Sequence, residues 1–179
     1  MRTLQIVHLI FGSCISLTIM AEDPLKVSCN NQAVCTLVEV KTGKILISGL
    51  SATPTIRAIS NDFFEIRTSC GSPCSASAYY DQRGGRISKT FPDVISMLPE
   101  PGIVIFVAAG KIMCSSVFSS DKKPLQIKTK WPLAETASVI SAVVSAEFLS
   151  PASVKLTYLT GAEFKEVTET ISLKIVAKE

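Results

Sequence analysis

The stretch FFEIRTSCGSPCSASAYY, residues 63–80, holds two runs of strand-forming residues with two cysteines between them. Aromatic, β-branched and small residues fill the runs Phe63 to Thr68 and Ser75 to Tyr80. Short runs of this composition, bounded by Gly, Pro and Ser, are typical of β-strands. Cys70 and Cys74 stand where the two runs meet, and a disulfide there would hold the ends of neighbouring strands together.

Runs of the same kind continue along the chain, and helical periodicity is scarce. Glycine turns separate four pairs of runs, at Thr42-Gly43, Gly84-Gly85, Ala109-Gly110 and Thr160-Gly161, where glycine can take the positive φ of a tight hairpin. This spacing predicts an all-β protein made of antiparallel hairpins. The other runs are Lys26 to Ser28, Cys35 to Val40, Ile45 to Ser48, Arg86 to Phe91, Val94 to Met97, Ile103 to Ala108, Lys111 to Phe118, Leu125 to Thr129, Val154 to Leu159 and Val167 to Val176.

Residues 134–148 form the one ambiguous stretch. Leu133, Ala137, Ile140 and Val144 recur at helical spacing, whereas the Val and Ser content also suits a strand. We expect a short helix or an irregular segment there.

A sequence pattern that occurs twice, here called the internal echo, indicates the architecture. Cys29, Cys35 and Gly43-Lys44-Ile45 are followed by Cys70, Cys74 and Gly85-Arg86-Ile87 after about 40 residues, which is the length of a propeller blade. Only three or so such units fit into the chain, fewer than a closed propeller needs. We therefore expect a blade-like, propeller-like but incomplete arrangement of hairpins, with a sandwich as the alternative.

Composition limits the function classes. The chain has 179 residues, 47% of them hydrophobic, with 18 Lys and Arg against 15 Asp and Glu. This length suits one domain with a sizeable core, and the apolar fraction argues against disorder. A net charge of +3 is too small and too dispersed for a nucleic-acid footprint, so no nucleic-acid partner is expected.

Residues 1–21 have the features of a secretory signal peptide. An apolar stretch from Leu4 to Met20 follows Arg2, and the small residue Ala21 precedes an acidic pair. We expect cleavage after Ala21, a single β domain over residues 22–179 and a periplasmic location.

Two alternatives apply to the same segment. A membrane anchor would need about 20 uninterrupted apolar residues, and polar residues interrupt this stretch, so no stable span is expected after signal removal. Lipidation at Cys14 is the second alternative, although Cys14 lies very close to the N-terminus.

Removal of the signal takes away Cys14 and His8, the one histidine of the sequence. In an oxidising compartment the close cysteine pairs are expected to form disulfides, Cys29 with Cys35 and Cys70 with Cys74. A four-cysteine zinc site is the alternative, but the first pair has five residues between its cysteines, wider than the usual spacing. Cys114, in an apolar run, is expected to be a buried structural thiol.

The expected mature chain offers little catalytic chemistry. Without histidine it cannot form a Ser-His-Asp or Cys-His unit. Carboxylate pairs such as Glu163 and Glu166 could serve a glycosidase, although solvated surface charge is the better interpretation. Phosphate-cradle and calcium-loop motifs are missing, so we expect a protein that is not an enzyme, with no cofactor and no metal.

Surface for binding is what remains. The run from Lys111 opens into a loop rich in small hydroxyl side chains, and such loops on β scaffolds commonly carry recognition. An ordinary polar connection is the alternative interpretation. The partner-binding candidates are Ser115, Ser116, Phe118, Ser119, Ser120 and Asp121.

Other candidates are basic or aromatic. Lys122-Lys123 could form a patch for an acidic partner, although a solvated face is the default. Tyr79-Tyr80 and Trp131 are candidate anchors at an interface. Alternation along a strand would point one of the two tyrosines inward, and Trp131 could instead cap the core.

Several motifs resemble a group of small exported proteobacterial proteins over about residues 60–175. They are Ser69-Cys70-Gly71-Ser72-Pro73-Cys74, Tyr80-Asp81, Gly85-Arg86-Ile87-Ser88, and the late residues Tyr158, Leu159, Gly161, Glu166, Glu169, Thr170 and Ile171. In size, signal sequence, cysteine pairing and hairpin organisation, the chain also resembles the periplasmic immunity proteins that protect bacteria from type VI secretion amidases attacking peptidoglycan.

This second resemblance implies an inhibitor that plugs the cysteine-histidine cleft of a wall-degrading amidase with a serine-bearing loop. Ser115, Ser116, Ser119 and Ser120 would then be the inhibitory candidates. The alternatives are a lysozyme inhibitor and a structural or assembly component of the bacterial envelope.

Overall fold

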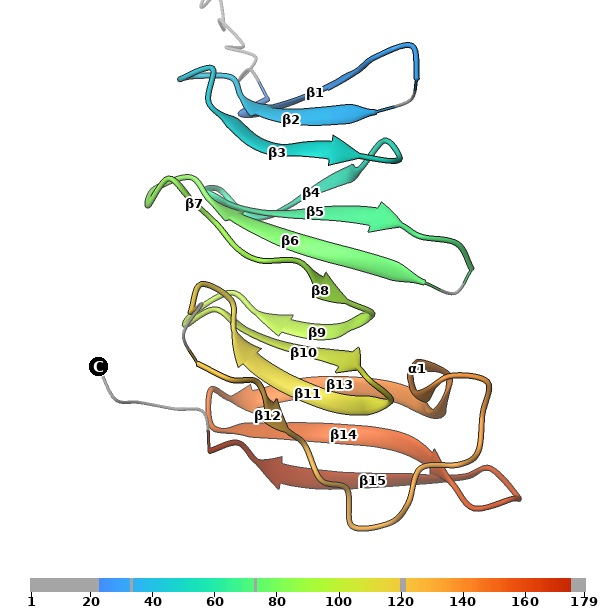
Figure 1. Ribbon diagram of the computed structural model, residues 1–179. Coiled ribbons are helices and arrows are strands. Elements are labelled where there is room, and N and C mark those ends of the chain that lie inside the picture. Colours follow the sequence, from blue (N-terminus) through green and yellow to red (C-terminus); the bar gives the residue numbers. More distant parts are fainter. Residues whose placement is uncertain (1–22, 33, 73, 120–121, 175–179) are drawn as a thin grey trace, which may run out of the picture.

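The computed structural model of the protein describes residues 23–32, 34–72, 74–119 and 122–174. The expected signal peptide, with His8 and Cys14, and the loop residues Ser120 and Asp121 therefore lie outside the described residues. In the part that is described, short antiparallel strands follow one another with a single helical turn, and no sheet closes into a barrel (Figure 1). The prediction of an antiparallel all-β fold is confirmed.

The strands form four sheets in the order of the chain, here called the first to fourth sheets (Figure 1). The first sheet contains β1 (Leu25–Cys29), β2 (Cys35–Glu39) and β3 (Ile45–Leu50). The second contains β4 (Thr55–Ser60), β5 (Phe63–Ser69), β6 (Ser75–Asp81), β7 (Arg86–Ile87) and β8 (Phe91–Pro92).

The third sheet contains β9 (Val94–Leu98), β10 (Ile103–Ala108), β11 (Lys111–Ser116) and β12 (Leu125–Gln126). The helical turn α1 (Val139–Ala142) leads into the fourth sheet, which contains β13 (Val143–Ser150), β14 (Ser153–Thr160) and β15 (Lys165–Ser172). The four expected glycine hairpins are all present, between β2 and β3, β6 and β7, β10 and β11, and β14 and β15.

A separate apolar core fills each of the three seams between successive sheets. On β5 and β6, Phe63 and Tyr79 face the third sheet, whereas their neighbours Phe64 and Tyr80 face the first sheet. Side chains that alternate along a strand point to opposite faces, so a sheet covered on both sides buries all of them. The expectation that only one tyrosine points inward was wrong, since Tyr79 is 1% exposed and Tyr80 0%.

The third sheet is also buried on both faces. Val104 and Phe106 pack toward the second sheet, and Ile103 and Ile105 pack toward the fourth. Strand β10 is consequently an uninterrupted apolar run with no polar side chain on either face.

The sheets stack like the blades of an open, incomplete propeller, with the first sheet at one end and the fourth at the other (Figure 1). Four units are present among the described residues where about three were expected, because the first and fourth sheets have only three strands each. The internal echo corresponds to the first two sheets. Their matching turns also touch, since Lys44 Nζ donates a hydrogen bond to the Gly85 carbonyl at 3.2 Å.

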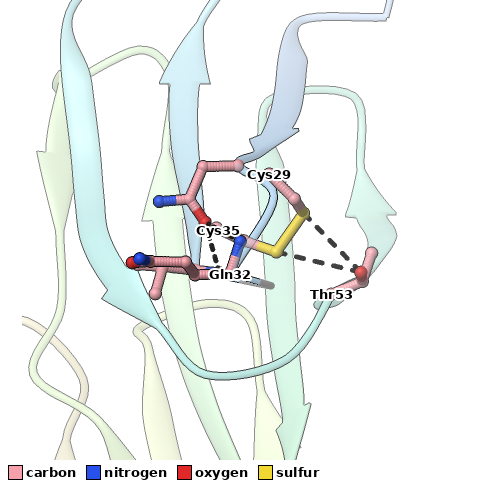
Figure 2. Close-up of a disulfide and its surroundings, with 6 residues drawn as sticks. Cys29, Gln32, Cys35 and Thr53 are labelled. Atoms are coloured by element: carbon pink, nitrogen blue, oxygen red, sulfur yellow. Dashed lines mark hydrogen bonds between the residues drawn. A yellow bond between two sulfur atoms is a disulfide. The ribbon is translucent and has the colours of Figure 1, made fainter.

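One disulfide closes a hairpin in each of these two sheets, as predicted. Cys29–Cys35 joins two residues that pair directly across β1 and β2, and Cys70–Cys74 joins the ends of β5 and β6. The Thr53 hydroxyl lies 3.7 Å from Cys29 Sγ and 3.8 Å from Cys35 Sγ, linking the first tip to the connection before β4 (Figure 2). Both tips lie along one edge of the stack, called here the disulfide edge (Figure 1).

The ambiguous stretch 134–148 contains an irregular segment, one short helical turn and the first part of a strand. Only Val139–Ala142 is helical, and β13 follows at once. Strand β13 carries two irregularities in its pairing with β14, which shift its partly buried positions to Val143, Ala146 and Phe148. This spacing of three and then two hides the period of a regular strand. Strand β4 was also missed; it is a mostly exposed edge strand in which apolar residues do not alternate strictly with polar ones.

The hairpin between β10 and β11 provides a test of the turn. Ala109 and Gly110 both have positive φ, 49° and 70°, as a two-residue turn of the mirror-image type requires. Replacing the exposed Ala109 with Asn, which tolerates this conformation, should raise the free energy of unfolding by about 1 kcal/mol. Gly110→Ala should lower it by a similar amount, and urea denaturation measures both. Equal stability of Ala109→Asn and the parent would contradict this turn geometry.

A buried carboxylate between the first two sheets makes stability depend on pH. Glu39 is 7% exposed and accepts hydrogen bonds from the Thr42 and Tyr80 hydroxyls, which hold its pKa below the ordinary value of 4.5. Because the pKa of Glu39 is lower in the folded state than in the unfolded state, its ionised form stabilises the protein fully at pH values above the unfolded-state pKa. This contribution is lost as the pH falls through the lower, folded-state pKa.

Glu39→Gln should therefore reduce the loss of stability between pH 7 and pH 3, as measured by urea denaturation at a series of pH values. The control is Glu163→Gln in the exposed turn before β15. An unchanged pH profile in Glu39→Gln would show that Glu39 does not carry this dependence.

Candidate functional site

The serine loop, defined as the described residues Ser116–Ser119 and Lys122–Pro124, lies between β11 and β12 at the edge of the stack opposite the disulfide edge (Figure 1). Ser115, just before it, is 3% exposed, and its hydroxyl donates to the Ser116 carbonyl at 3.1 Å. Ser115 is thus covered by neighbouring residues in the free protein. Ser116, Phe118 and Ser119 are half-buried.

Phe118 packs against the protein instead of projecting as a free anchor. Its ring meets the Phe63 ring edge-on, with 5.8 Å between centroids, and the Arg86 guanidinium lies 4.6 Å from the Phe118 centroid. The Val117 N–H donates to the Gly102 carbonyl at 2.8 Å, which ties the start of the loop to the turn between β9 and β10. The predicted anchor therefore forms part of the wall of a cavity.

This arginine cavity, of about 290 Å³, opens between the second and third sheets. Two ion pairs stand in its wall, Arg83 with Asp62 at 2.8 Å and Arg86 with Asp81 at 2.7 Å. Its lining residues are Ser60, Asp62, Phe63, Asp81, Arg83, Arg86, Pro99, Glu100, Pro101, Gly102 and Phe118.

Partial burial works against ionisation of Asp81, but hydrogen bonds from Arg86 and from the Gly84 N–H keep its pKa below the ordinary value. The ion pair therefore keeps its charges, and Arg86 is held over Phe118. Sequence reasoning placed these charges in a hairpin turn and did not bring them to Phe118. The available signal was the opposite charge of Asp81 and Arg86 on either side of Gly84-Gly85.

A second, lysine cavity of about 210 Å³ lies on the other side of the serine loop. Lys122 and Lys123 contribute to it from the loop, and Lys174 contributes from the segment after β15. No acidic side chain is among its described lining residues, which are Cys114, Ser115, Ser116, Lys122, Lys123, Leu125 and Lys174. The sequence indicated the Lys122-Lys123 pair, but Lys174 is distant in the chain and was missed.

Cys114 is the one described cysteine outside a disulfide, and it is 0% exposed. Burial raises the pKa of its thiol to about 12, which suppresses the thiolate that a nucleophile or a metal ligand needs. The prediction of a buried thiol is confirmed. No group of three metal-ligating side chains occurs in residues 23–32, 34–72, 74–119 and 122–174, and no helix in those ranges is long and apolar enough to cross a membrane.

Trp131 is 50% exposed on the segment between β12 and α1. Its backbone N–H donates to the Tyr158 hydroxyl at 3.2 Å, and Lys130 Nζ lies 5.4 Å from the ring centroid. The indole thus remains available as a contact, but nothing places it in the wall of either cavity beside the serine loop.

The chain was compared with protein-family models and with curated protein sequences, and neither comparison gives a match.

The inertness of Cys114 can be measured by alkylation. The chain without residues 1–21, with its disulfides intact, should not react with iodoacetamide at pH 8 in its native state, because the Cys114 thiol is buried and its pKa is raised. In denaturant one thiol should react, and mass spectrometry counts the adducts. Rapid labelling of the native protein would show that Cys114 is accessible.

Proposed function

We propose that the chain is a non-catalytic periplasmic inhibitor, an immunity protein that binds a cell-wall-degrading effector of the peptidoglycan-amidase class and occludes its active site. The observation that carries the proposal is the position of the serine loop between the arginine cavity and the lysine cavity. Loops held by a well-packed scaffold are common recognition elements.

The chemistry next to the loop suits protein recognition. Arginine and aromatic side chains contribute strongly to interfaces, and Arg83 and Arg86 keep 81% and 59% of their side chains exposed. The lysines on the other side are matched by no acidic lining residue, so they favour a partner with an acidic surface beside its active site. Ser116 and Ser119 are small enough to enter a narrow cleft, where their hydroxyls can donate and accept hydrogen bonds.

The disulfides support an exported protein, because such bonds persist in oxidising compartments. The buried thiol of Cys114 supports a binding function over catalysis at this site. An effector with a cysteine-histidine pair would supply the reactive groups, and this chain would cover them.

Capture of the partner tests the proposal. The exported protein, immobilised and exposed to a periplasmic extract of the producing cells, should retain a peptidoglycan amidase, identified by mass spectrometry. Addition of the purified protein in equimolar amount should then stop that enzyme from clearing a peptidoglycan suspension. Retention and inhibition of a lysozyme would favour the alternative inhibitor. Retention of envelope proteins alone, or self-association, would favour an assembly component and contradict the inhibitor.

Ser119→Glu tests the loop itself. The longer, charged side chain should weaken binding to the captured hydrolase by about tenfold or more, because it cannot enter a cleft that admits serine. The melting temperature should stay unchanged, since Ser119 is only half-buried. The control is Ser51→Glu, on the exposed connection between β3 and β4. Equal inhibition by Ser119→Glu and the parent would remove the serine loop from the interface.

A further inference from the structure

A third cavity, of about 390 Å³, lies between the second and third sheets toward the disulfide edge. It is separate from the serine loop, because strands β4, β5, β6 and β9 form its walls. Its lining residues are Thr55, Arg57, Glu65, Arg67, Tyr79, Val94, Ile95, Ser96 and Met97. We call it the seam cavity.

The hydroxyl of Tyr79 is a buried polar group that lacks a hydrogen-bond partner among the described residues. Tyr79 is 1% exposed, and its ring stacks on Phe63 with centroids 5.9 Å apart and tilts against Phe91 at 6.2 Å. Buried hydroxyls are almost always paired, so an unpaired one in a cavity wall indicates a place for an acceptor. Burial, and next the Glu65 carboxylate, raise the pKa of this phenol, which therefore stays protonated and able to donate.

The charges of the seam cavity do not balance. Arg57 binds the Glu65 carboxylate at 2.8 Å, and the other oxygen of Glu65 accepts a hydrogen bond from the Ser77 hydroxyl at 2.9 Å. Glu65 is thus fully engaged by its own neighbours. Arg67 donates to the Ser75 hydroxyl at 3.1 Å, and no described carboxylate forms an ion pair with it. One positive charge is left over in a cavity whose wall also contains a hydroxyl that can donate.

Strand pairing places these two groups together on one face of the second sheet. Tyr79 lies directly opposite Glu65 across β5 and β6, and Arg67 is the next residue of β5 on the same face. Both face the third sheet, where Val94 and Met97 of β9 supply apolar wall. The pocket thus combines a cation, a hydroxyl donor and an apolar side.

We propose that the seam cavity binds a singly charged carboxylate whose oxygens accept hydrogen bonds from Arg67 and from the Tyr79 hydroxyl, with an apolar group of the ligand against Val94 and Met97. Guanidinium groups match carboxylates in geometry, and one excess positive charge matches one carboxylate better than a doubly charged phosphate. A cavity of this size admits an amino-acid-sized group. This site lies beyond the proposed inhibitor function and does not rest on it.

Calorimetric titration of the exported protein with N-acetyl-leucine tests the proposal, with N-acetyl-leucinamide as the uncharged control. The acid should bind in the millimolar range or tighter, and the amide should not. Arg67→Gln should weaken binding by about tenfold or more, whereas Arg83→Gln in the arginine cavity should leave it unchanged.

Tyr79→Phe separates ligand binding from folding. Because the hydroxyl has no described partner, its removal should not lower the melting temperature of the free protein, but it should weaken binding of N-acetyl-leucine. A lower melting temperature would show that the hydroxyl has a structural partner and would overturn the proposal. Equal binding of acid and amide, no binding at millimolar concentration, or a preference for inorganic phosphate would also overturn it.

Two peptides distinguish the sources of the carboxylate. One ends in leucine with a free carboxyl terminus, and the other has an amidated terminus and an internal glutamate. Binding of the first alone assigns the site to chain ends or free acids, and binding of the second assigns it to acidic side chains. Failure of both, with N-acetyl-leucine also inactive, would contradict the site.

Discussion

Burial of the second and third sheets on both faces is the constraint on which the structure depends. Phe63 and Tyr79 point to one side of the second sheet, and Phe64 and Tyr80 point to the other. Each pair fills a different seam, so the same few residues of β5 and β6 join three sheets. A one-residue slip in their pairing would exchange the two faces and disturb both cores at once. The Cys70–Cys74 disulfide joins the ends of β5 and β6 and therefore opposes such a change of register.

This packing also determines where polar chemistry can gather. The aromatic cluster of Phe63, Tyr79, Phe91 and Phe106 fills the middle of the seam between the second and third sheets. Polar side chains occupy its two ends, the arginine cavity beside Phe63 and the seam cavity beside Tyr79. Strands β5 and β6 thus extend from one cavity to the other, and a closely packed apolar region separates the two cavities.

Much of the fold was readable from the sequence because local signals agreed there. The cysteine pairs, the glycine turns and the apolar runs predicted the hairpins and both disulfides. Strand β13 was missed because its pairing irregularities break the period of two. Burial of the second tyrosine was missed because alternation cannot tell whether one face or both faces of a sheet are covered. The cavities could not be predicted from the sequence for another reason: Arg86 contacts Phe118, and Lys174 lines the same cavity as Lys122, only because folding brings distant segments together.

The polar groups in the seam between the second and third sheets stabilise the fold no more than apolar residues in the same places would. Glu65 is buried, whereas its partner Arg57 keeps 69% of its side chain exposed; such a pair commonly stabilises a fold no better than well-packed hydrophobic side chains, because the carboxylate loses water. The hydroxyl of Tyr79, which is unpaired among the described residues, destabilises the free protein, and phenylalanine would fill the same space without this cost. Residues that cost stability where apolar ones would fit are expected at sites that bind something. The seam cavity has this character, whereas Glu39 and Tyr80 satisfy each other across the neighbouring seam and serve the fold.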